Sequence, residues 1–262
     1  MVRAIGTMGH ALHTLIRDLH RRRGRERRGL ALAEGVRLVE EALAARLEIR
    51  AVLASPALEG TGRGRALKAA LLEASVPVEE AVDGELAELA ATEHPQGVLA
   101  VVVPRRWTLE QVSPAPRAPA LVLDAVQDPG NVGTIVRTGH ALGAVGVLAL
   151  PGTAEFTNPK TLRASMGAIF QLPCVSLDDG TLRAWCTDRR VKVFLADASA
   201  PLPDRATVTQ SLCLVFGNEG AGPGPRLQEL AAGRFGVPLR AGADSLNVAV
   251  AAAILLHEVT RE

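Results

Sequence analysis

The chain has 262 residues, a net charge of +1, and a composition that is 48% hydrophobic but only 3% aromatic. This length allows one large or two ordinary domains, and the apolar fraction allows sizeable aliphatic cores. No apolar run reaches 18 residues and no signal-peptide pattern opens the chain, so we expect a cytoplasmic protein with no membrane partner.

Cysteine and histidine residues give no sign of a metal site. Neither the three cysteines nor the six histidines have metal-ligand spacing, and we therefore expect no metal. Cys174 and Cys213 lie in apolar runs that resemble strands, which predicts inert core residues.

Positive charge is concentrated at the N-terminus. Residues 1–30 contain eight Arg and two acidic residues, a net charge of +6, whereas residues 31–110 have a net charge of −5. The chain therefore carries a local basic element and not a basic body.

This basic element ends a predicted helix over residues 10–28. Apolar residues recur there at helical spacing, namely Leu12, Leu15, Ile16 and Leu19. Six arginines follow within eight residues and could neutralise several phosphates, although arginines also complement the dipole at a helix C-terminus. The density favours RNA contact, and the predicted RNA-binding residues are Arg21, Arg22, Arg23, Arg25, Arg27 and Arg28.

A small α/β domain is predicted over residues 1–104. Helices are expected at 36–45, 63–74 and 85–91, and strands at 49–54, 76–78 and 98–103. Prolines and a polar start make residues 105–119 a linker.

A second α/β domain is predicted over residues 120–262. Strands are expected at 120–123, 145–150, 191–196, 212–216 and 235–239, and helices at 132–142, 161–168, 181–186, 225–232 and 246–259. Apolar strands separated by helices favour a mainly parallel sheet that is covered on both faces.

Three polar stretches follow apolar strands in this second domain. The first is Asp128-Pro-Gly-Asn131, with Arg137 further along the expected helix, and the second is Gly217-Asn-Glu-Gly-Ala-Gly222. The third runs into the last helix, where Ser245 is the expected N-cap and Asn247 lies early in the helix. The glycine spacing is G-x-x-G-x-G, which argues against a dinucleotide loop.

Together these stretches resemble the three motifs of SpoU-type RNA 2′-O-ribose methyltransferases, the TrmH-like branch of the SPOUT superfamily. The resemblance implies an N-terminal α/β domain like an RNA-binding ribosomal protein and a C-terminal SPOUT α/β domain with a deep trefoil knot. It also implies S-adenosylmethionine as the cofactor, RNA as the substrate, and a homodimer formed through the knotted domain. The separate N-terminal domain makes ribosomal RNA the more favoured substrate.

The resemblance also implies roles for individual residues. The catalytic residues would be Arg137, Asn131, Glu219, Ser245 and Asn247, and the cofactor-binding residues Gly217, Val237, Leu239 and Leu246. Arginine stays protonated in almost every protein environment, so a charge role for Arg137 is physically easier than a general-base role. Without the resemblance, Arg137 could simply pair with Asp124 or Asp128.

Several alternatives remain open from the sequence. The substrate could be transfer RNA, or the chain could be a non-catalytic RNA-binding or ribosome-assembly protein on the same fold. Arg163 lies in a segment that resembles a family segment between the first two motifs, and it could touch RNA or belong to an ordinary helix start. The Glu34-Gly35 and Gln96-Gly97 pairs resemble pairs in the family's N-terminal domain and could equally be turn residues.

Overall fold

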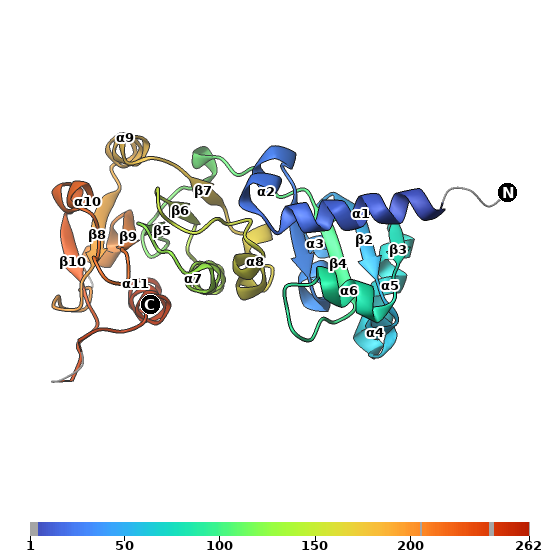
Figure 1. Cartoon of the computed structure of the whole chain (residues 1–262). Coiled ribbons are helices and arrows are strands. Elements are labelled where there is room, and N and C mark those ends of the chain that lie inside the picture. The colour runs from blue at the N-terminus through green and yellow to red at the C-terminus, as the bar shows by residue number, and fades with distance from the viewer. Residues whose placement is uncertain (1–4, 205, 241–243, 262) are drawn as a thin grey trace. The chain divides into compact units, whose positions relative to one another are not determined.

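The computed structural model describes residues 5–204, 206–240 and 244–261, with side chains from residue 11 onward. Within these ranges no helix is long and apolar enough to cross a bilayer. The chain forms two compact units, whose elements are labelled in Figure 1. The first comprises Met1–Arg106 and Thr157–Phe170, and the second comprises Trp107–Phe156 and Gln171–Glu262. The sequence prediction had assigned the segment Thr157–Phe170 to the C-terminal domain.

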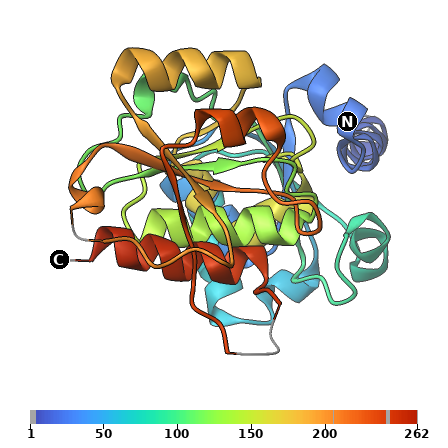
Figure 2. The same ribbon diagram turned by 90° about the vertical axis from the view of Figure 1, so that its left-hand side faces the viewer.

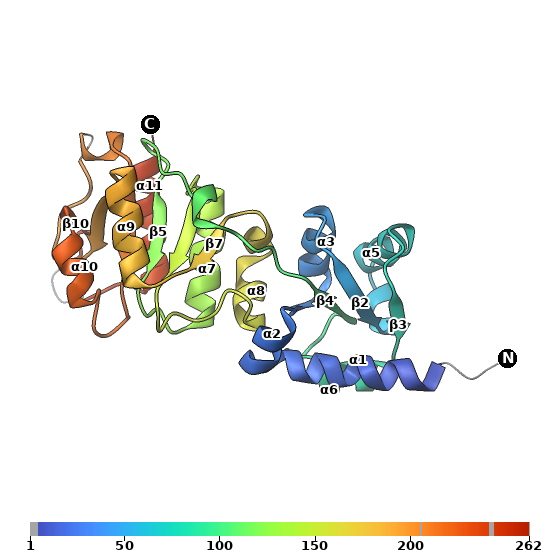
Figure 3. The ribbon, with the colours of Figure 1, turned by 90° about the horizontal axis from the view of Figure 1, so that it is seen from above.

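The first unit is a four-stranded sheet, in the order β1-β4-β2-β3, with helices on both faces (Figure 3). Its strands are β1 (Ala31–Glu34), β2 (Ile49–Ala54), β3 (Val78–Glu80) and β4 (Val98–Val102). Its helices are α1 (Ile5–Leu19), α2 (Arg22–Arg28), α3 (Val36–Ala44), α4 (Pro56–Glu59), α5 (Gly62–Glu73), α6 (Asp83–Leu89) and α8 (Pro159–Ser165), with a 3₁₀ helix at Ala168–Phe170. Helices α1 and α6 pack a leucine-rich layer onto one face of the sheet, and α3 and α5 cover the other. The predicted small α/β fold is confirmed.

The predicted helix over residues 10–28 is in fact two helices, α1 and α2. Arg25 is only 4% exposed, and its Nη1 donates to the carbonyl oxygens of Leu19 and His20 at 3.1 and 3.0 Å. A Cβ at position 24 would collide with the main-chain oxygen of Asp18, so Gly24 permits the sharp turn. The helix breaks here because the Arg25 side chain donates hydrogen bonds to carbonyl groups at the end of α1, which have no partner within that helix.

The Glu34-Gly35 and Gln96-Gly97 pairs have structural roles in the first unit. Gln96 Oε1 accepts the N–H of Val36 at 2.9 Å and so caps the start of α3. Gly35 and Gly97 have φ angles of 97° and 72°, a region that strongly favours glycine. These residues therefore shape turns at the ends of β1, α3 and β4.

The Glu34 carboxylate is a buried junction of the first unit. Its side chain is 3% exposed and accepts hydrogen bonds from the N–H groups of Ala91 and Thr92, both at 3.0 Å, and from the Thr92 hydroxyl at 2.5 Å. Arg163 on α8 completes the set with an ion pair at 2.9 Å. This pair anchors the segment Thr157–Phe170 in the first unit.

The second unit is a six-stranded parallel sheet in the order β10-β8-β9-β5-β6-β7. Its strands are β5 (Ala120–Leu123), β6 (Gly146–Ala149), β7 (Cys174–Ser176), β8 (Lys192–Ala196), β9 (Leu212–Phe216) and β10 (Gly233–Phe235). Its helices are α7 (Pro129–Ala141), α9 (Asp179–Arg189), α10 (Pro225–Leu230) and α11 (Val248–Thr260), with 3₁₀ helices at Leu109–Gln111 and Thr207–Thr209. Helices α9 and α10 lie on one face of the sheet, and α7 and α11 lie on the other (Figure 2). The predicted doubly covered parallel sheet is confirmed.

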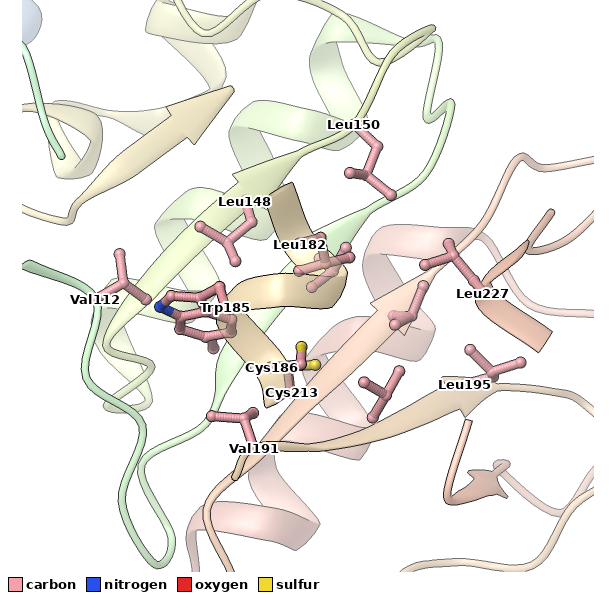
Figure 4. Packing of buried hydrophobic residues seen from close by; sticks show 14 residues of the cluster. Val112, Leu148, Leu150, Leu182, Trp185, Cys186, Val191, Leu195, Cys213 and Leu227 are labelled. Atoms are coloured by element: carbon pink, nitrogen blue, oxygen red, sulfur yellow. The ribbon is translucent and has the colours of Figure 1, made fainter. Parts of the chain in front are cut away.

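A core of buried aliphatic residues and Trp185 fills the space between this sheet and α9 (Figure 4). The sulfur atoms of Cys186 and Cys213 lie next to each other in it. A hydrogen bond with Cys186 and burial both raise the pKa of Cys213, which agrees with an inert core thiol. Cys174 is only partly buried, although loss of hydration around its sulfur raises its pKa as well.

The C-terminal elements differ from the sequence prediction in two places. The strand expected at 235–239 is β10, Gly233–Phe235, because the N–H of Gly236 leaves the sheet and bonds the carbonyl of Pro201 at 2.8 Å. The helix expected from residue 246 begins at Val248. The described residues between them, 236–240 and 244–247, form no helix or strand, and residues 241–243 lie outside the described ranges.

Candidate functional site

The first motif forms the start of α7, where Asp128 and not Asn131 caps the helix. Asp128 is the N-cap and accepts the N–H of Gly130 at 2.7 Å, and Pro129 occupies the first helical position. The cap of this helix is therefore Asp128 and not Asn131. Asn131 lies inside the first turn, and its side chain is available for other partners.

The second motif is a compact loop after β9, and Asn218 organises it. Its Oδ1 accepts the N–H groups of Gly220 and Ala221, while its Nδ2 donates to the carbonyl of Ala125 at 3.1 Å. A Cβ at Gly217 would collide with the main chain at Gly222 and Pro223. The glycine is therefore required by the closure of the loop on itself, and Glu219 is presented at its exposed tip.

The third motif begins α11, with Asn247 as the N-cap. Its Oδ1 accepts the N–H groups of Ala249 and Val250 at 2.9 and 3.3 Å. The predicted N-cap, Ser245, lies two residues earlier, exposed to solvent. The Asn247 side chain also has a partner in the first motif, through its Nδ2.

Side-chain hydrogen bonds join the three motifs into one polar cluster, which we define as Asn131, Glu219 and Asn247. Asn247 Nδ2 donates to Asn131 Oδ1 at 3.1 Å, and Asn131 Nδ2 donates to Glu219 Oε1 at 3.0 Å. Each amide therefore uses its oxygen toward one neighbour and its nitrogen toward the next, which fixes the orientation of both. The carboxylate of Glu219, an exposed residue, ends the series.

A cavity of about 380 Å³ lies beside this cluster. Its wall contains the predicted residues Gly217, Glu219, Val237, Leu239, Ser245, Leu246 and Asn247. The main-chain groups of Val237, Leu239 and Leu246 make no hydrogen bond within the described ranges. Backbone groups in such a wall need partners, and an apolar cavity of this size with a few polar groups is typical of a small-molecule site. An adenosyl cofactor fits these features, since its base could pair with the main chain and its apolar surface could meet the leucines.

Arg137 is not part of the cavity wall. It lies six residues beyond Asn131 on α7, which is about 9 Å along the helix and about 240° around it. Its side chain is exposed and makes no hydrogen bond or ion pair with a described residue. The alternative pairing with Asp124 is not formed, because that carboxylate accepts the N–H of Gly224 at 2.7 Å. Within a single chain, Arg137 is therefore separate from the cluster.

Comparison with known proteins agrees with this site. The SpoU rRNA Methylase family model matches residues 118–257, and the MRM3-like substrate binding domain matches residues 15–100. The chain belongs to the SpoU rRNA methylase family. It is 33% identical to the Bacillus subtilis 23S rRNA (guanosine(2553)-2′-O)-methyltransferase RlmP, over 93% of each chain.

Solved structures of SpoU methylases show the same fold. The SpoU methyltransferase AviRb from Streptomyces viridochromogenes, in complex with AdoMet, superposes with a TM-score of 0.81 at 28% identity, covering 94% of this chain and 95% of that one. An AdoMet-bound rRNA methyltransferase from Sinorhizobium meliloti gives the same score and identity, covering 95% and 93%. This likeness extends over both compact units.

In the first unit of this SpoU methylase, the predicted arginine cluster divides into a buried group and an exposed group. Arg25 is buried against the end of α1, so its predicted RNA contact is wrong. Arg27 and Arg28 pair with Asp18 at 2.8 and 2.5 Å, and these two guanidinium groups hold the pKa of that carboxyl below its usual value. The RNA-binding role of the exposed arginines stays a prediction.

Three of the exposed arginines, Arg21, Arg27 and Arg28, line a surface cleft of the first unit. This cleft measures about 260 Å³ and is lined by Thr14, Arg17, Asp18, Arg21, Arg27 and Arg28. Arg21 and Arg23 make no ion pair with a described residue. The balance of one carboxylate against several guanidinium groups leaves this surface positive.

Sequence reasoning missed three residues that shape the site, namely Asn218, Asp124 and Asp197. Asn218 and Asp124 were passed over because their partners are backbone groups, which leave no side-chain pattern in the sequence. Asp197 follows β8 and lines the cavity, but it lies outside all three motifs. Its only signal is its position after a parallel strand, where ligand sites of α/β sheets commonly form.

Proposed function

We propose that this protein transfers the methyl group of S-adenosylmethionine to a ribose 2′-hydroxyl of ribosomal RNA. The observation that carries this proposal is the meeting of Asn131, Glu219 and Asn247 beside a cavity whose wall has main-chain groups without a partner among the described residues. The family membership and the names of the relatives support the same reaction. A non-catalytic RNA-binding role would not need this hydrogen-bonded set.

The cavity residues have distinct tasks in this proposal. S-adenosylmethionine supplies an electrophilic methyl group on a sulfonium sulfur. The main chain at Val237, Leu239 and Leu246 would hold the adenosine portion, and Gly217 would let the loop pass close to it. Glu219 provides negative charge near the cavity, which suits a cationic cofactor and a hydrogen-bonding ribose. The unpaired Ser245 hydroxyl would orient the nucleotide.

Arg137 would act on the RNA and not on the cofactor. Its guanidinium can hold a phosphate with two hydrogen bonds and stabilise negative charge on the 2′-oxygen as its proton leaves. Removal of that proton by Arg137 itself would require a deprotonated guanidinium, which proteins rarely provide. We therefore favour the electrostatic role.

We further propose that a homodimer completes the site. Arg137 is exposed and far around α7 from Asn131, so a second copy could bring its own Arg137 to the cavity. Helix α11 packs beside α7 and carries an exposed apolar side chain, Val250, which is 47% exposed. Such a surface suits a symmetric contact through this unit.

The C-terminal trefoil knot is also a proposal. It is supported by the family resemblance and by the passage of the chain after β10 against the segment after β8, where Gly236 bonds Pro201. Single-molecule unfolding would test it, because pulling on the termini of a knotted chain leaves a shorter extended length than its residue number allows. Full extension would reject the knot.

The substrate is proposed from the first unit and from the relatives. The match to a substrate-binding domain and the exposed arginines favour a large structured RNA over transfer RNA, which remains the alternative. A cytoplasmic location would follow from a ribosomal substrate and is likewise a proposal, which fractionation of the producing cells would test.

A labelling experiment tests the function directly. Purified protein and the Arg137→Ala variant would be incubated with methyl-labelled S-adenosylmethionine and unmodified total RNA, and the digested nucleosides separated. We expect label in one 2′-O-methyl nucleoside from the ribosomal fraction and none with the variant. Label in the transfer RNA fraction would establish the alternative substrate. Absence of both label and cofactor binding would reject the enzyme and favour an RNA-binding protein.

A further inference from the structure

Asp197 connects two segments that form one wall of the cavity. It follows the last residue of β8, and its Oδ1 accepts both the N–H and the hydroxyl of Ser199 at 2.9 and 2.7 Å. Its Oδ2 accepts Arg234 Nη1 at 2.7 Å from β10. Hydrogen bonds from Ser199 and the charge of Arg234 lower the pKa of Asp197, so the carboxylate is ionised near neutral pH.

The backbone joins the same two segments at close range. The N–H of Asp197 bonds the carbonyl of Phe235 at 2.9 Å, and the N–H of Gly236 bonds the carbonyl of Pro201 at 2.8 Å. A Cβ at Gly236 would collide with the main-chain oxygens of Asp197 and Ala200. The loop after β8 therefore lies directly on the chain that leaves β10, and only glycine fits the crossing.

This crossing fixes the residues that follow it. Val237 and Leu239 come one and three residues after Gly236, in the cavity wall, with main-chain groups that have no partner within the described ranges. Extended chain outside a sheet has no ladder to hold it, so its position depends on such anchors. The anchors at this point are Asp197, Arg234 and Gly236.

Two roles for Asp197 can be distinguished by chemistry. Asp197 lines the cavity, and its negative charge could attract the positive sulfonium of the cofactor. However, both of its oxygens already accept hydrogen bonds from within the protein. These three hydrogen bonds occupy most of its acceptor sites, and Arg234 neutralises part of its charge, so a structural role uses the partners as they stand, whereas a direct role relies on the remaining charge.

We propose that Asp197 and Arg234 form a clamp that positions the main chain of Val237 and Leu239 for the cofactor. Asp197 is thus a positioning residue of the cofactor site and not a ligand of the cofactor's charge. The inference rests on the proposed function, because it concerns the same S-adenosylmethionine site.

Calorimetry with two ligands tests the clamp. Asp197→Asn keeps the shape but sets an amide against Arg234, and Arg234→Ala removes the other half of the pair. We expect each variant to bind both S-adenosylmethionine and S-adenosylhomocysteine with about tenfold lower affinity, with kcat at saturating cofactor unchanged. The uncharged thioether of S-adenosylhomocysteine makes it the informative probe. Arg226→Ala, which breaks the ion pair with Asp179 outside this cavity, is the matched control.

The outcomes separate the possibilities. Loss of S-adenosylmethionine binding alone in Asp197→Asn would overturn the clamp in favour of a direct charge contact. If the wild type binds both ligands and the variants bind them equally well, the clamp is also overturned. If the wild type binds neither ligand, both the clamp and the proposed function are rejected. If the other variants fail to fold, Ser199→Ala provides the test, because it removes only one hydrogen bond to Asp197. It should lower the affinity for both ligands by the same factor. The double variant should be no weaker than Asp197→Asn alone, because the two residues act as one pair.

Discussion

Asn247 donates a hydrogen bond to Asn131 across 116 positions of sequence, at 3.1 Å, while its own oxygen caps α11. One side chain therefore caps the start of a helix and orients the polar cluster at the same time. The two tasks use different atoms, Oδ1 for the cap and Nδ2 for Asn131, so substitutions can separate them.

Serine and alanine at position 247 should give different results. Asn247→Ser keeps a good cap but loses Asn131, and we expect near-normal stability with kcat reduced about tenfold to a hundredfold. Asn247→Ala loses both and should cost about 1 kcal/mol of unfolding free energy in addition. Thermal unfolding and methylation rates of the purified variants measure the two effects. Equal activity of Asn247→Ser and wild type would show that the contact with Asn131 has no catalytic importance.

Mixed dimers should show where Arg137 acts. Arg137→Ala and Glu219→Ala are each expected to be inactive, and we expect coexpression of the two chains to restore activity. If Arg137 acts in the partner's cavity, each mixed dimer has one of its two sites with both residues intact. Random pairing makes about half of the dimers mixed, so the sample should have about a quarter of the wild-type activity. The methylation assay on the mixed sample, with each variant alone as the control, makes the measurement. No recovery in isolated mixed dimers would place Arg137 in the cavity of its own chain.

The arginines of the first unit should separate by salt dependence. Arg21→Ala with Arg23→Ala should reduce the slope of log affinity for RNA against log salt by about 2, because each exposed guanidinium releases counterions. Arg25→Ala should instead destabilise the first unit by about 2 kcal/mol through the loss of hydrogen bonds to buried carbonyls. RNA-binding titrations at several salt concentrations make the comparison. A slope change with Arg25→Ala in folded protein, or none with the double variant, would contradict this division.

Breaking the Glu34–Arg163 pair should loosen α8 from the first unit. Arg163→Ala leaves a 3% exposed carboxylate without its counter-charge, and we expect a local cost of about 2 kcal/mol. Hydrogen exchange should then be faster by about tenfold or more in peptides covering Ala91, Thr92 and α8. Arg37→Ala, on an exposed ion pair with Glu41, is the control with little expected effect. Reduced RNA affinity with unchanged exchange would show that Arg163 instead contacts RNA.

The sequence by itself determined several local elements and the three polar motifs. Apolar runs such as Leu212–Phe216 identified a buried parallel strand with its observed bounds, because the period of side chains depends only on neighbouring residues. The order and spacing of Asn131, Glu219 and Asn247 in their motifs identified the family before any contact was known. These signals are local, so they can be recognised without knowledge of the fold.

The tertiary structure alone decided which partner each polar group takes. Asn247 caps α11 in place of Ser245, Arg25 closes α1 where RNA contact was expected, and Arg163 pairs with Glu34 from 129 positions away. A polar side chain has several competent partners nearby in sequence, and its choice depends on which distant groups are desolvated beside it. That choice is made by packing, and it is why the clamp at Asp197 has no sequence pattern of its own.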